Sequence, residues 1–161
     1  MVVRSYESLL FADYFQFYLQ DDSPEAGGQN PWNGQATDDL LAVAPGLVCV
    51  KTARNMIVPV QVRIHGADPG LTTDGWDHVT ECCLTVRSGR IVVAGCPDYL
   101  RDATRIAVEL RVYSVRILYK NLESLSANGL EGEDQYVVLL WPGEASPPRV
   151  VKRRSVAAGP R

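Results

Sequence analysis

The residues of this 161-residue chain that best suit metal binding or covalent catalysis are its two histidines and four cysteines. Asp74, Asp77 and His78 lie close together, and Cys82 follows four residues later. On a strand that separation is about 13 Å at ~3.3 Å per residue, and the spacing matches no strong metal template. Pairing His78 with Cys82 or Cys83 would give a base and a nucleophile, but packed strand cysteines are usually inert. We therefore predict no catalytic residue, no metal and no cofactor.

Charged residues are unevenly distributed along the chain. Residues 1–46 contain seven acids and one base, whereas residues 149–161 contain five bases and no acid. The two segments can neutralise each other, with the basic end as a solvated tail, or the acidic face can meet a basic partner. The net charge of −3 gives no reason to expect binding to nucleic acid or to a membrane.

The segment 21–39 is rich in turn-forming residues and contains one tryptophan. A loop of this length in a compact domain is either disordered or functional. The tryptophan can be a lid over the core or a contact for a partner, and the acids can compete with phosphate for a basic cleft. The predicted partner-binding residues are Asp21, Asp22, Trp32, Asp38 and Asp39.

Strands are predicted wherever apolar residues alternate. In residues 112–120 the apolar Tyr113, Val115, Ile117 and Tyr119 alternate with Ser114, Arg116 and Lys120, as in a strand with one buried face, whereas residues 135–141 are apolar on both faces. We therefore expect the strand 135–141 to lie centrally in a sheet that is covered on both sides, with 112–120 as its neighbour. Trp141 shares a face with Val137 and Leu139 and should be buried.

Three further patterns set expectations about connections. Residues 7–20 read as one strand, in which Asp13 either marks a bulge or is buried. Residues 56–64 alternate cleanly, but Pro59 cannot donate to a ladder and predicts an edge strand or a bulge. Such an edge can be blunted by the proline or pair across a homodimer axis. Ser88-Gly89 predicts a tight hairpin.

About eight short strands with long loops predict an all-β fold, a single-domain antiparallel β-sandwich or flattened barrel. The domain should span residues 1–151, with 152–161 as a basic flexible tail. The cysteines show no C-x-x-C spacing, and we find no signal peptide and no apolar run of membrane-spanning length. These features predict a cytoplasmic protein with reduced, mostly buried thiols.

Residues 44–118 resemble the competence protein J family, small β-rich bacterial proteins. The resemblance rests on Ala44-Pro45-Gly46-Leu47-Val48, Thr52, the alternating 58–64, Val79 to Ser88-Gly89, Ile106-x-Val108 and Tyr113-x-Val115. Arg111 and Val112 stand where the family's glycine before Tyr113 is expected. The resemblance implies a nuclease inhibitor that binds and blocks its partner, and it identifies no site residue.

Two functions follow as hypotheses. The first is a non-enzymatic protein-binding module of a bacterial type, an inhibitor or immunity protein that blocks a basic partner such as a nuclease. The second is a small-molecule or carbohydrate-binding sandwich, or a hydrolase, that uses loop residues around Trp32 and Trp76-Asp77-His78.

Overall fold

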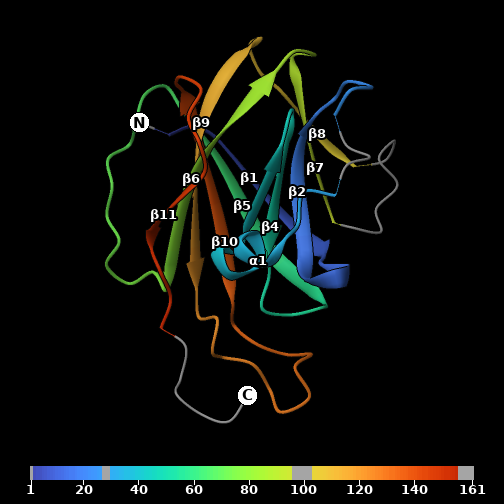
Figure 1. The fold of residues 1–161 in the computed structure, drawn as a ribbon, viewed down its shortest axis with the longest axis vertical. Helices are drawn as coiled ribbons and strands as arrows, with labels where there is room; N and C mark the ends of the chain where they lie inside the picture. Colours follow the sequence, from blue (N-terminus) through green and yellow to red (C-terminus); the bar gives the residue numbers. More distant parts are fainter. Residues whose placement is uncertain (1, 27–29, 96–102, 156–161) are drawn as a thin grey trace.

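The chain folds into two β-sheets that face each other (Figure 1). The computed structural model describes residues 2–26, 30–95 and 103–155. The larger sheet has the order β1-β5-β10-β9-β6-β11 and the smaller sheet β3-β4-β2-β7-β8. Among the strands that the structure describes, only β5 and β10 pair in parallel. The predicted all-β sandwich is confirmed, as two open sheets and not a barrel.

The larger sheet contains β1 (Val2–Phe11), β5 (Ile57–His65), β10 (Gln135–Pro142), β9 (Arg111–Lys120), β6 (His78–Val86) and β11 (Arg149–Lys152). The smaller sheet contains β3 (Leu41–Ala44), β4 (Leu47–Lys51), β2 (Gln16–Asp21), β7 (Arg90–Gly95) and β8 (Thr104–Ala107). Two short helices complete the described chain, the 3-10 helix η1 (Asp13–Phe15) and α1 (Gly34–Asp39).

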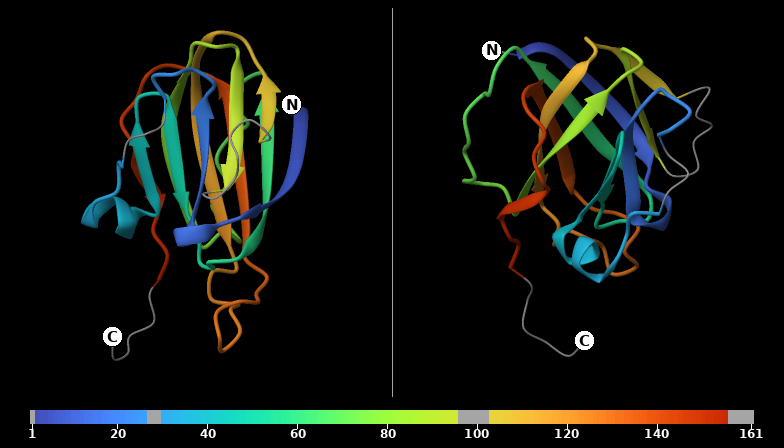
Figure 2. Two further views of the ribbon diagram at one scale, coloured as in Figure 1. Left: turned by 90° about the vertical axis from the view of Figure 1, so that its right-hand side faces the viewer. Right: turned by 45° about the horizontal axis from the view of Figure 1, so that its top comes forward.

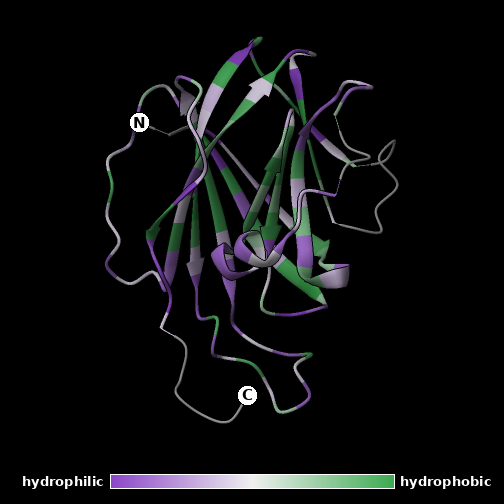
Figure 3. Ribbon diagram, in the orientation of Figure 1, coloured by the Kyte–Doolittle hydropathy of each residue, from purple (hydrophilic) through white to green (hydrophobic). Residues whose placement is uncertain are grey.

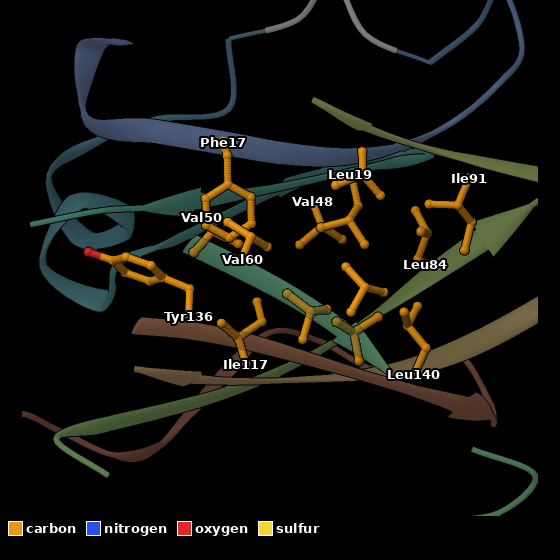
Figure 4. Close-up of a cluster of buried hydrophobic side chains, with 14 of the residues drawn as sticks. Phe17, Leu19, Val48, Val50, Val60, Leu84, Ile91, Ile117, Tyr136 and Leu140 are labelled. Atoms are coloured by element: carbon orange, nitrogen blue, oxygen red, sulfur yellow. The ribbon is translucent and has the colours of Figure 1, made fainter. Parts of the chain in front are cut away.

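The core fills the space between the sheets, where apolar side chains from alternate strand positions meet. Figure 4 shows Phe17 and Val50 of the smaller sheet above Val60 and Tyr136 of the larger sheet. Strand interiors are accordingly hydrophobic and most connections are polar (Figure 3). This alternation is the pattern that made the strands predictable from the sequence.

β10 lies in the interior of the larger sheet, between β5 and β9, and both of its faces are buried. Its outward side chains Val137, Leu139 and Trp141 belong to a second apolar cluster. The connection 66–77 supplies part of the cover for this outer face, seen at the left of Figure 1. The prediction of a central strand covered on both sides, with Trp141 buried, is confirmed.

Arg116 fastens this cover to the sheet. The residue is only 4% exposed, and its guanidinium lies 4.6 Å from the ring centroid of Trp141 and forms an ion pair with Glu81 at 2.6 Å. It also donates to Asp68 and to the carbonyl of Gly70 in the covering connection. A buried guanidinium needs several acceptors, so this one arginine joins β9, β6 and the connection.

Three sequence expectations about connections are wrong. Residues 7–20 form two strands, because β1 belongs to the larger sheet and β2 to the smaller. Pro59 lies on the interior strand β5, opposite Leu9 of the true edge strand β1. Ser88-Gly89 does not close a hairpin, because β6 and β7 belong to different sheets. Local patterns identified these strands but not the sheet that each one joins.

The chain changes sheets between β1 and β2 at a tight crossing. Ala12 is fully buried and donates its N–H to the carbonyl of Met56 at 2.9 Å. Asp13, expected at a bulge or buried, is half-buried in η1, and its carboxylate accepts from the Tyr14 N–H. Across the crossing, a Cβ on Gly95 would lie 3.0 Å from the carbonyl carbon of Phe11, and nearer still to its oxygen. Only glycine allows this approach.

Gly95→Ala should destabilise the protein, because the new methyl group meets the Phe11 backbone, which cannot rotate away. We expect a loss of about 1–3 kcal/mol in the free energy of unfolding, as for other overpacked sites. Gly34→Ala is the matched control: a Cβ there meets nothing within 4 Å, and alanine favours the helix by up to ~1 kcal/mol. Urea unfolding of both variants measures the difference. Equal stability of the two variants would contradict the tight crossing.

Candidate partner-binding surface

The five predicted partner-binding residues lie at opposite ends of the sandwich. Trp32 bonds to Gln16 at the first residue of β2, whereas Asp21 is the last residue of that strand. Five steps along a strand correspond to roughly 17 Å. Trp32, Asp38 and Asp39 therefore mark the lower end in Figure 1, together with η1 and α1. Asp21 and Asp22 mark the upper end.

Asp21 and Asp22 are engaged inside the protein. Asp21 is 1% exposed and accepts hydrogen bonds from the N–H groups of Arg87 and Ser88 and from the Ser88 hydroxyl. Burial alone would raise the pKa of Asp21, but these hydrogen bonds outweigh burial and lower it. Asp22 accepts from Arg90 at 2.8 Å and Arg105 at 3.0 Å, and these hydrogen bonds lower its pKa. Both carboxylates hold the upper connections together.

Trp32 covers the outer face of the smaller sheet. Its ring packs against a small apolar cluster that includes Ala42 and Leu47, and its Nε1–H donates to the Gln16 side chain at 2.8 Å. The ammonium of Lys51 lies 5.8 Å from the ring centroid. Trp32 is half-buried, so it has the position of a lid while part of its ring still faces solvent.

The carboxyl-terminal basic segment lies against α1. Arg153 donates to the Asp39 carboxylate at 2.6 Å and to the Asp38 carbonyl at 3.1 Å. Burial raises the pKa of Asp39, but the hydrogen bonds from Arg153 and Gln35 outweigh it and the net pKa is lowered. The Asp38 side chain is exposed. Acidic and basic segments therefore neutralise each other at Asp39, while Asp38 keeps its carboxylate free of ion pairs within the described chain.

His78 links α1 to the same segment. It is fully buried, and its Nε2 bonds the Asp39 carbonyl at 2.7 Å while its Nδ1 accepts the Arg154 N–H at 3.0 Å. These partners require the neutral imidazole with its proton on Nε2. Burial lowers the pKa of His78, and Arg153 and Arg154 act in the same direction. With both nitrogens in use, His78 fastens the fold and cannot ligate a metal.

The Trp76-Asp77-His78 group does not form a platform with Trp32. Trp76 packs on the outer cluster of the larger sheet, whereas Trp32 packs on the smaller sheet. A pocket of about 290 Å³ does lie beside Asp77, but Lys152, Arg153 and Arg154 line it as well. The Asp77 carboxylate is engaged by the Leu122 N–H at 2.9 Å.

The cysteine sites follow the strand pattern. Cys82 faces the core, where burial raises its pKa strongly, and Cys83 points the other way, toward the Ser146 carbonyl. Cys96 lies outside the described residues. Among the residues that the structure describes, no group of three or more His, Cys, Asp or Glu side chains could hold a metal ion. None of the described helices is long and apolar enough to cross a membrane.

Sequence reasoning missed an exposed apolar patch at the lower end, named here the lower apolar patch. It consists of Leu9, Phe11, Tyr14, Phe15, Met56 and Ile57. Leu9 is 75% and Tyr14 74% exposed. In a single strand over residues 7–20, Leu9 and Phe11 would share a face with Phe17, but the crossing at η1 reverses that relation. Leu10 and Phe17 are the buried residues.

Exposed acids also gather at the lower end, on the connection 121–134. Glu123, Glu131 and Glu133 are exposed, and none has an ion-pair partner among the described residues. Arg54 anchors the connection through Asp134 at 2.6 Å and through the Leu130 carbonyl at 3.3 Å. Figure 2 shows this connection extending beyond α1 and η1 at the same end.

Comparison with known proteins places the fold. No family model matches the chain, and no curated protein matches it. Among solved structures, ComJ from Bacillus subtilis, described as an inhibitor of the DNA-degrading activity of NucA, aligns with a TM-score of 0.68 and 15% identity over 89% of this chain and 99% of ComJ. The protein of crocagin biosynthetic gene J aligns with a TM-score of 0.59 and 14% identity, over 88% and 98%. This chain therefore has the fold of ComJ.

The buried neutral His78 predicts that stability falls as the pH falls. Its folded-state pKa is lowered, so below about pH 6.5 the unfolded chain takes up a proton that the folded chain resists. The contribution of neutral His78 to the free energy of unfolding is complete above that pH, and it is lost as the pH falls toward the lowered pKa of the folded state. We expect a loss of about 1 kcal/mol between pH 7.5 and 5.5.

Urea unfolding at the two pH values measures this loss in the wild type and in His78→Gln. The variant lacks the titrating group, so its stability should change less between the same two pH values. An identical change in both proteins would show that other groups cause the pH dependence.

Proposed function

We propose that this chain binds a second protein through its lower end and inhibits it, and that the partner presents a basic surface, as a nuclease does. Its fold is that of ComJ, which inhibits the DNA-degrading activity of NucA. Because a fold can carry many functions, the proposal must also rest on the site. In this proposal the chain is a binding protein without catalytic activity that acts in the cytoplasm of a bacterium.

The observation that carries the proposal is the coincidence of three features at one end. Trp32, the lower apolar patch and four exposed carboxylates all lie there. The carboxylates belong to Asp38, Glu123, Glu131 and Glu133, and among the described residues none of them is paired with a cation. Protein interfaces combine an apolar centre with a polar rim, and unpaired charge steers association. At the upper end, Asp21 and Asp22 are already satisfied internally.

A basic partner is favoured by the sign of this charge. A nuclease cleft that binds phosphate carries lysine and arginine, and exposed carboxylates compete for those side chains. The anchored connection 121–134 presents its acids in one arrangement, because Arg54 and the Ser124 and Ser126 hydroxyls hold its backbone. Preorganisation of this kind lowers the entropy cost of binding.

The charge-reversed pair Glu131→Lys/Glu133→Lys should weaken partner binding about tenfold or more, because it replaces attraction with repulsion across the interface. The matched control is Glu25→Lys/Glu109→Lys, with the same charge change away from the lower end. Both proteins and the wild type serve as bait for affinity capture from the native host, at low and high salt. The recovered partner is then assayed for loss of activity, DNA degradation first, upon addition of each protein.

The expected result is one partner that the wild type and the control recover and inhibit, more strongly at low salt. Recovery of no partner at either salt contradicts the proposed function. Equal loss of partner binding in both charge-reversed variants would show that net charge, and not this surface, determines binding.

A further inference from the structure

We infer that the lower apolar patch is the anchor of the partner surface, and that it docks into a nonpolar groove with lysine or arginine at its rim. The inference rests on the proposed function and adds the residues that carry the contact. Tyr14 and Phe15 of η1 are its centre, with Leu9 and Phe11 of β1 and the neighbouring Met56 and Ile57 completing it.

The patch holds most of the large hydrophobic side chains that are exposed in the described chain. Nine large hydrophobic side chains are exposed in the described chain, and six belong to this patch. Phe11 pairs directly with Ile57 across β1 and β5, and Leu9 pairs with Pro59 on the same outward face. Single exposed apolar residues are ordinary, but a group of them gathered at one end of a fold marks an interaction site.

Backbone strain at the centre of the patch is the second observation. Tyr14 has φ 57° and Phe15 φ 60°, so two consecutive aromatic residues occupy the left-handed region. Bulky side chains rarely adopt that conformation, and glycine or asparagine adopts it more readily. Because Tyr14 is 74% exposed, burial within this chain offsets little of the cost. Aromatic side chains kept at a strained, exposed turn indicate a requirement outside the fold.

The strained turn is also held firmly. The Ala12 N–H donates to the Met56 carbonyl at 2.9 Å, and the Thr52 N–H donates to the Phe15 carbonyl at 2.9 Å. The backbone of Phe11 rests against Gly95, where a side chain would collide. The aromatic rings are thus presented from a fixed backbone, and a partner need not order that backbone on binding.

Two carboxylates beside the patch favour a partner with a basic rim. Glu7 projects from the outward face of β1 two residues before Leu9, and Asp13 precedes Tyr14. Neither carboxylate has an ion-pair partner among the described residues. A second copy of this chain would bring the same carboxylates against its own, whereas a basic rim would complement them. The ammonium of Lys51 lies 5.6 Å from the Phe15 ring centroid and 5.8 Å from the Trp32 ring centroid, so both rings lie beside the same cation.

The stability of Tyr14→Gly/Phe15→Gly provides the first test. Because this change relieves the left-handed strain and removes little buried surface, the urea midpoint should be unchanged or higher. Leu10 lies four residues before Tyr14 but in the core, so Leu10→Ala should lower the urea midpoint. A midpoint for the glycine variant as low as that of Leu10→Ala would assign the aromatic pair a structural role and overturn the inference.

Photo-cross-linking in the native host tests the contact itself. A photoreactive phenylalanine analogue replaces Tyr14, and in the control it replaces Leu110, which is 70% exposed at the upper end. We expect one discrete adduct with another protein from position 14 and none from position 110. Excess wild-type chain should suppress that adduct, whereas Tyr14→Gly/Phe15→Gly should not. Mass spectrometry should map it to an apolar segment of the partner beside lysine or arginine.

Each remaining outcome overturns the inference. No adduct at position 14, or equal adducts at both positions, would show that the patch is not the contact. An adduct of two copies of this chain would assign the patch to self-association. If affinity capture recovers an inhibited partner while position 14 gives no adduct, the inference about the lower apolar patch is wrong and the proposed function stands. If capture also fails, the proposed function fails.

Discussion

The structure depends on one constraint, the change of sheet within a few residues between β1 and β2. Ala12 must be fully buried there, and Gly95 must lack a side chain so that the two backbones can approach. The same geometry forces Tyr14 and Phe15 into left-handed conformations. It places β1 at an edge of the larger sheet and β2 inside the smaller one. The tight crossing therefore fixes the backbone from which the exposed aromatic residues are presented.

Much of the fold could be predicted because alternation reports directly on which face of a strand is buried. The two apolar faces of β10 correctly indicated an interior strand covered on both sides. Alternation carries no information about which sheet a strand joins. Ser88-Gly89 therefore read as a hairpin although it connects the two sheets, and Pro59 read as an edge although β1 lies beyond it.

The candidate site was less predictable, because charge in a sequence does not show whether it is already paired. Asp21, Asp22 and Asp39 are satisfied by backbone groups or arginines that lie far away in the sequence. Glu131 and Glu133 are exposed and unpaired among the described residues, and their residue types alone do not distinguish them from the paired acids. Leu9 and Phe11 would share a face with the buried Phe17 only if residues 7–20 formed one strand, whereas they form two. Their exposure became visible only with the register of β1 against β5.

The parallel pairing of β5 with β10 has a consequence for biosynthesis. Val60 pairs with Tyr136, so the strand pairing of the larger sheet cannot be completed until most of the chain has been made. At 5–20 residues per second, the interval between these two residues is roughly 4–15 s. During that time the β1–β5 pair offers an unpaired edge and an uncovered apolar face, the kind of surface that aggregates. High-level expression should therefore favour inclusion bodies over soluble protein, and slower translation or chaperone supply should shift the yield toward the folded state.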